Sequence, residues 1–212
     1  MTSQEAGGPP GNPRLTARGA ATRDRIVHAA ADLMYVKGVN ATTLDDVIAA
    51  SGTSKSQLYR HFPSKDDLIH AVIALRGQQV MERESQRLER LNSFRGLVRW
   101  RDALVQANSL QNGAYGCALG SMANELADSD EQAAVSLAEL FARWEGLLAA
   151  GLRRMQDKGS LSTDADPDML ATGLMAALQG GYLLARTAHN CQPMEIALDL
   201  ALAQVRTYLI DA

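Results

Sequence analysis

The amino-acid sequence predicts an all-α protein of about nine helices. Apolar side chains recur at helical spacing from residue 16 onwards, and no stretch shows the alternation of a half-buried β-strand. Alanine, the strongest helix former, is frequent, while aromatic residues make up only 5% of the 212 residues. Capping residues, glycines and prolines stand where helices would begin and end. Together these observations predict a three-helix N-terminal head followed by a larger helical body.

The first helix is predicted from four apolar residues on one face. Ile26, Ala30, Leu33 and Met34 follow the spacing i, i+4, i+7 and i+8, and Gly38 ends the segment. We therefore expect a helix that buries one face and leaves the other to solvent.

Two short helices are expected next. Thr43 precedes Asp46 by three positions, which is the signature of a capping box at the start of a helix. Gly52 lies in a break of small residues about two turns later. Ser54 can cap the following helix, and Leu58 is its apolar anchor.

A long fourth helix and five further helices complete the prediction. A capping box at 64–67 opens the fourth helix, which continues into a highly charged stretch at 82–90. The later segments share helical periodicity and are expected at 93–110, 117–126, 129–158, 167–189 and 193–209. Their starts carry caps or prolines, namely Asp128 with Glu131, Pro167 and Pro193.

Charge is distributed unevenly along the chain, although the total of 21 Lys and Arg against 24 Asp and Glu is nearly balanced. Residues 1–80 carry nine Lys and Arg against seven acids, whereas residues 81–212 carry twelve against seventeen. The asymmetry indicates a head that faces nucleic acid and a body with another task. We expect a flexible arm at 1–15, a head at 16–80 and a body at 81–212.

Residues 43–62, TLDDVIAASGTSKSQLYRHF, have the layout of a helix-turn-helix, whose second helix enters the major groove. Lys55 and Gln57 can reach base edges, and the small Ser54 and Ser56 let the backbone approach DNA. Side chains beyond them can hydrogen-bond phosphates: Tyr59, His61 and Lys65. The alternative is an ordinary surface helix with solvated polar residues.

A longer series of features surrounds this motif. Lys37–Gly38, paired threonines, the Gly52 turn, LYRHF at 58–62 and SKDDL at 64–68 follow one another in order. The series resembles the DNA-binding head of TetR-family transcriptional regulators. The body is similar in arrangement to the ligand-binding part of that family, and its segments 116–126 and 138–144 resemble a subgroup associated with drug-resistance genes.

The resemblance implies a homodimeric, ligand-responsive regulator, most simply a repressor. It implies a DNA-binding domain at 16–80 and a ligand-binding and dimerisation domain at 81–212. It implies base-edge or nearby contacts for Lys55, Ser56 and Gln57. Phosphate contacts are implied for Thr43, Tyr59, His61 and Lys65. Some relatives carry a basic residue where this chain has Asp45 and Asp46, so base contacts are not expected from the first helix of the motif.

Two basic residues near the N-terminus have two possible roles. We place Arg14 and Arg18 on a flexible arm, which either reaches an adjacent groove or is a disordered tail.

The last two helices are predicted to form a dimer interface. Residues 169–185 are apolar almost all round, and so is most of 196–209, which means that more than one face must be buried. A partner subunit covers the second face economically, and a twofold dimer requires a palindromic operator in double-stranded DNA. The alternative is that both helices are central within one monomer.

The body also offers candidates for binding a small, largely hydrophobic effector. They are large or pliable apolar residues and two polar ones: Trp100, Met122, Phe141, Trp144, Met175, Gln179 and Tyr182. Gln179 interrupts an apolar stretch and must find a partner if it is buried. Most of the others fit an ordinary core equally well, and Asn124–Glu125 is a further polar candidate.

Catalysis and cofactor binding find no support in the sequence. It lacks metalloprotease, nucleophile-elbow and phosphate-loop motifs, and no cofactor or metal is expected. Cys117 and Cys191 are too few for a disulfide framework, and the polar N-terminus has no signal-peptide core, so we expect a cytoplasmic protein. The apolar run 169–185 is short for a membrane span. A helical enzyme and an architectural DNA-binding protein without an inducer remain alternatives.

Overall fold

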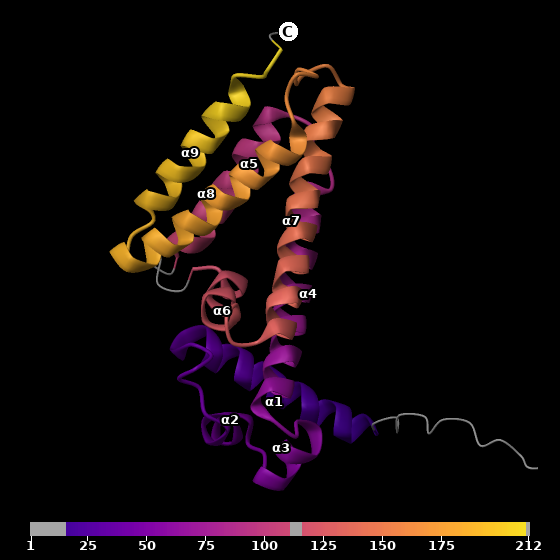
Figure 1. The fold of residues 1–212 in the computed structure, drawn as a ribbon, viewed down its shortest axis with the longest axis vertical. Helices are drawn as coiled ribbons and strands as arrows, with labels where there is room; N and C mark the ends of the chain where they lie inside the picture. The colour runs from indigo at the N-terminus through magenta and orange to yellow at the C-terminus, as the bar shows by residue number, and fades with distance from the viewer. Residues whose placement is uncertain (1–15, 111–115, 211–212) are drawn as a thin grey trace, which may run out of the picture.

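The computed structural model describes residues 16–110 and 116–210, which form nine α-helices arranged as a head and a body (Figure 1). This confirms the predicted all-α class. The helices are α1 Ala17–Lys37, α2 Leu44–Ser51, α3 Lys55–His61, α4 Lys65–Leu88, α5 Phe94–Ser109, α6 Ala118–Leu126, α7 Glu131–Asp157, α8 Pro167–Ala188 and α9 Gln192–Arg206.

The head consists of α1, α2, α3 and the first turns of α4, at one end of an elongated molecule (Figure 1). Its core joins one apolar side chain from each of these elements. Fully buried members are Ile26, Val47, Leu58 and Leu68. Because the helices are short, their stability depends on this shared core rather than on helix propensity alone.

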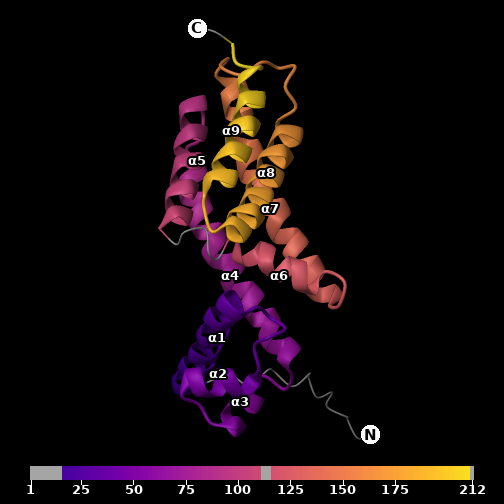
Figure 2. The ribbon, with the colours of Figure 1, turned by 90° about the vertical axis from the view of Figure 1, so that its left-hand side faces the viewer.

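In the body, α7 packs against α4 and α8, and α9 packs against α8 and α5. Figure 2 shows α8 and α9 side by side at the end farthest from the head, with α6 placed between the head and the rest of the body. Trp144 of α7 lies at the centre of this bundle and is among its largest fully buried side chains. The continuous helix α4 therefore belongs to both units.

Most predicted boundaries are confirmed, with three corrections. The N-cap of α7 is Asp130 rather than Asp128, because its carboxylate accepts a hydrogen bond from the Ala133 N–H at 2.9 Å. α9 ends at Arg206, before the predicted residue 209. Arg18 lies inside α1 and not on an arm; Arg14 and the expected arm 1–15 lie outside the described residues.

In the described part of the chain, none of the helices is at once long and apolar enough to cross a membrane.

Candidate nucleic-acid interface and internal cavities

The helix-turn-helix is held by one glycine and one leucine. Gly52 adopts a left-handed backbone (φ 63°, ψ 32°) at the end of α2, and its N–H donates to the Ile48 carbonyl. No atom lies within 4 Å of the position of an added Cβ, so the backbone angle and not space favours glycine there. Leu58 is fully buried and fixes α3 against the head. Its truncation to alanine is expected to cost about 2–5 kcal/mol.

The outer face of α3 presents polar side chains to solvent, as the motif predicts. Ser54, Lys55, Ser56 and Tyr59 are exposed. The Lys55 ammonium lies 5.9 Å from the centre of the Tyr59 ring. Arg60 is also exposed on α3 and was missed by the sequence reasoning, although its charge within the motif was a usable signal.

Gln57 has a structural task besides any contact with DNA. Its Oε1 accepts from the Ser54 N–H at 2.8 Å, while the Gln57 N–H donates to Ser54 Oγ at 3.3 Å. This reciprocal pair is the capping box of α3. The NH₂ group of the side chain is the part of Gln57 that the cap does not use.

The predicted phosphate contacts differ in accessibility. Thr43 is exposed at the N-terminus of α2. The Lys65 ammonium lies 3.4 Å from the carbonyl oxygen of Asn40, three residues before Thr43. His61 is different, since its Nε2 is buried without a hydrogen-bond partner among the described residues. Burial, together with the charges of Arg60 and Arg23, lowers the pKa of His61. A neutral, half-buried imidazole is a poorer phosphate ligand than the prediction assumed.

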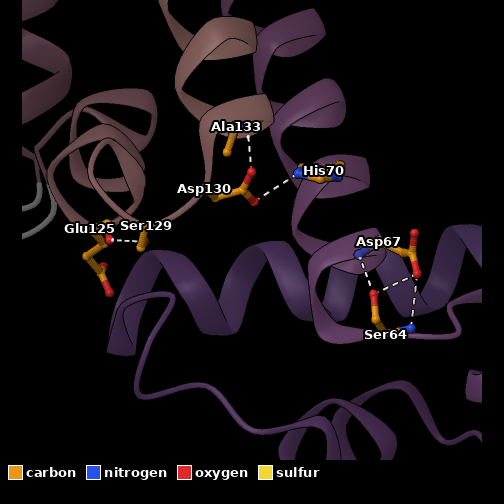
Figure 3. Close-up of polar contacts among 7 residues, drawn as sticks. All are labelled: Ser64, Asp67, His70, Glu125, Ser129, Asp130 and Ala133. Atoms are coloured by element: carbon orange, nitrogen blue, oxygen red, sulfur yellow. Dashed lines mark hydrogen bonds and ion pairs between the residues drawn. The ribbon is translucent and has the colours of Figure 1, made fainter.

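Several polar contacts join the head to the body. Glu125 of α6 accepts the backbone N–H groups of Val39 (3.0 Å) and Asn40 (2.8 Å), directly after α1. Figure 3 shows Asp130 between His70 of α4 and Ala133, with a distance of 2.9 Å from His70 Nε2 to Asp130 Oδ2. Glu125, a polar candidate for ligand binding in the sequence, therefore holds the head instead.

Two cavities lie inside the body, side by side. The first, of about 280 Å³, is lined by residues of α1, α4, α5, α6, α7 and α8, and the second, of about 340 Å³, lies between α6, α7 and α8. They share three lining residues, Gly116, Cys117 and Tyr182. Burial raises the pKa of both the Cys117 thiol and the Tyr182 phenol, so both groups are neutral. Cys117 and Cys191 are both free.

The cavities collect four of the seven predicted effector residues. Trp144 lines the first, Phe141 and Gln179 line the second, and Tyr182 lines both. Met122 borders a much smaller space beside α1. Trp100 and Met175 are buried and are not among the described residues that line either cavity. Both residues therefore fit an ordinary core better than a ligand site. The indole N–H of Trp100 also donates a hydrogen bond to Glu84 at 3.1 Å.

Gln179 is placed by a close approach of two helices. Its Oε1 lies 2.7 Å from where a Cβ on Gly120 would stand, so α6 has a glycine where α8 projects this amide. Its Nε2 is buried and has no hydrogen-bond partner in the described chain. A polar atom in this state is available to a ligand.

The sequence reasoning missed the arginines that line the first cavity. Arg76, Arg83 and Arg87 of α4 all contribute to its wall. Their spacings of seven and four residues place them on one stripe of a helix, which was a usable signal.

One face of α8 and α9 carries apolar side chains that the monomer leaves uncovered. Leu183 and Leu184 of α8 and Ile196 and Leu200 of α9 are all exposed, Leu200 by 69%. Leu174, which the sequence placed on the same apolar helix, is fully buried within the monomer. Single exposed leucines are ordinary, whereas several on two adjacent helices are consistent with the predicted interface.

Comparison with known proteins gives matches along both units. Residues 26–72 match the bacterial regulatory proteins of the TetR family, and residues 94–199 match the C-terminal domain of LmrA/YxaF-like transcriptional regulators. The chain is 26% identical over 188 residues to the uncharacterised HTH-type regulator YxaF of Bacillus subtilis, covering 85% of this chain and 92% of that protein. It is 25% identical to the HTH-type repressor DhaR of a Mycobacterium species, covering 82% and 86%.

Solved structures share the fold. A TetR regulator from Chloroflexus aurantiacus superposes with a TM-score of 0.82 at 24% identity, covering 93% of this chain and all of that one. A TetR regulatory protein from Rhodobacter sphaeroides gives a TM-score of 0.79 at 19% identity, covering 89% and 99%.

Proposed function

The chain belongs to the TetR family of DNA-binding transcriptional regulators, and we propose that it is a homodimeric repressor that a small effector releases from a palindromic operator. The observation that carries the proposal is the exposed polar face of α3, on a head that α4 connects to two cavities in the body. An architectural DNA-binding protein has no use for such cavities. The site of action we propose is the compartment that holds the DNA, the cytoplasm.

The proposed division of labour on DNA follows the accessibility of each side chain. Lys55 and the free NH₂ group of Gln57 contact base edges, with Ser54 and Ser56 allowing close approach. Tyr59 and Lys65 contact phosphates together with Thr43. His61 has the weakest support of the group, because its Nε2 is buried.

The proposed route of control passes through α6 and α4. α6 supplies one wall of the second cavity and also carries Glu125, which accepts two backbone N–H groups of the head. α4 supplies one wall of the first cavity and holds Asp130 of α7 through His70. An effector that favours one arrangement of these helices shifts the population of DNA-binding heads, by a coupling of about 1–3 kcal/mol.

The experiment that tests the proposal uses DNA from upstream of the protein's own gene. We expect fluorescence anisotropy to show tight binding of a fragment that contains an inverted repeat, and footprinting to show two symmetric protected segments. Lys55→Ala should weaken binding, whereas Lys158→Ala, which removes the same charge from an exposed position in the body, should not. Equal affinity for unrelated DNA at the same salt concentration, or a Lys55→Ala protein that binds like the wild type, would contradict the proposal.

A further inference from the structure

Positively charged side chains line one side of the first cavity. Three of its lining residues are arginines, and none of the described residues that line it is Asp or Glu. Resting on the regulatory function proposed above, we infer that the effector is a small organic carboxylate with an apolar body, and that it binds in this cavity against Arg76, Arg83 and Arg87.

The protein neutralises these arginines only in part. Glu84 is fully buried behind them and accepts from both Arg83 Nε (3.1 Å) and Arg87 Nη1 (2.8 Å). One carboxylate is thus shared by two guanidinium groups. Arg76 pairs with Asp32 at 2.9 Å, but the Asp32 side chain is 79% exposed and its charge is screened by water and salt. The cavity therefore retains a positive potential that favours an anion.

Hydrogen-bond donors at the cavity also lack acceptors. Trp144 is 1% exposed and lines the cavity, yet its Nε1 has no partner among the described residues, and the same holds for Arg76 Nε. Buried donors are normally paired. The neutral Tyr182 phenol adds a further O–H group. A ligand rich in acceptor oxygens matches this set better than a pure hydrocarbon or an amine does.

The rest of the lining explains why the anion should carry an apolar body. Val80, Leu104 and the ring of Trp144 supply apolar surface on the sides of the cavity. A volume of about 280 Å³ is near the lower limit for small-molecule sites, which suits a compact acid. Arg83 and Arg87 use one nitrogen each on Glu84, and no described residue accepts from their remaining N–H groups. Those groups can bind a carboxylate in a forked geometry.

The test uses titration calorimetry on the full-length protein without DNA. The probes are benzoate, phenylacetate and hexanoate, each paired with its neutral amide, and inorganic phosphate as an anion without an apolar body. We expect at least one acid to bind while its amide and phosphate do not. Arg83→Gln should weaken that binding by about tenfold to a hundredfold. Arg83 is half exposed, so this variant should fold. Trp144→Phe, which removes the indole N–H together with part of the ring, should also weaken binding.

The matched control is Arg90→Gln, which removes an exposed arginine just beyond α4 and outside the cavity lining. It should bind the acid like the wild type. The inference is overturned if no acid binds at millimolar concentration, if amides or phosphate bind as well as the acids, or if Arg83→Gln retains wild-type affinity. Release of operator DNA is measured separately. An acid that binds without releasing DNA contradicts the proposed function but supports the carboxylate site. Release of DNA by a neutral amide supports the proposed function but contradicts the carboxylate site.

Discussion

At the recognition helix, Gln57 can offer DNA only part of its side chain. Bidentate recognition of adenine uses the oxygen and the nitrogen of a Gln side chain together. Here Oε1 is already turned towards the Ser54 N–H in the capping box of α3, whereas the cap does not use the NH₂ group. We therefore expect Gln57 to donate to an acceptor in the major groove, and Lys55 to contribute a second donor.

The first prediction separates base contacts from phosphate contacts. Lys55→Ala should cost about 1–3 kcal/mol on the preferred operator and relax base choice at one position. Lys65→Ala should weaken all sequences alike and reduce the slope of log affinity against log salt by about one. Anisotropy titrations of the operator and of single-base variants, over a range of salt concentrations, measure both effects. Identical behaviour of the two variants would contradict the assignment.

The second prediction concerns Glu125, whose carboxylate accepts two backbone N–H groups of the head. Glu125→Ala leaves both donors without their partner, and we expect a loss of about 1–3 kcal/mol of unfolding free energy. If α6 carries the signal, this variant should also bind operator with little response to the effector. Asp128→Ala, which removes an exposed acid from the neighbouring loop, is the control and should respond normally. A fully inducible Glu125→Ala protein would exclude this route.

Which side chains face solvent on α3 could be predicted from the sequence, because capping residues and periodicity fix the orientation of a short helix. The partners of Glu84 and Glu125 and the burial of His61 Nε2 could not. Glu125 meets Val39 from 86 residues away, and Glu84 meets Trp100 from the next helix. Periodicity states which face of a helix is apolar and is silent about which helix covers it.

Among the elements, α7 begins with a cap that also joins two helices. The Ala133 N–H is the main cause of the low pKa of the Asp130 carboxyl, and the hydrogen bond from His70 contributes to it. The spacing of Asp128 to Glu131 predicted Asp128 as the cap. That prediction was wrong, because the contact of Asp130 with His70 of α4 is invisible to a local pattern.

The third prediction follows from this cap. A carboxyl whose pKa in the folded state lies below its ordinary value of 3.8 stabilises the fold above that pH, and the contribution disappears as pH falls through the folded pKa. Asp130→Ala should therefore lower the midpoint of thermal unfolding near neutral pH, by the equivalent of about 1 kcal/mol. The difference from wild type should shrink in acid. Asp128→Ala serves as the control, and a pH-independent difference would contradict this account.

For the whole molecule, the uncovered apolar face of α8 and α9 predicts a dimer. Leu200→Glu places a charge on this face, so we expect a folded monomer in sedimentation analysis, with weakened operator binding. Leu174→Glu instead buries the charge in the monomer core and should reduce the yield of folded protein. A wild-type chain that sediments as a monomer at micromolar concentration would refute the interface.

The unbroken length of α4 determines how far a small rotation at one end of this helix displaces its other end. At 1.5 Å per residue its 24 residues span about 36 Å. A rotation of about 5° at the end near Arg83 and Arg87 moves the opposite end by about 3 Å. Base contacts in the major groove require positioning to about 0.5 Å. We therefore expect that a bound effector that turns α4 by this angle takes the recognition helices of the proposed dimer out of register with their half-sites.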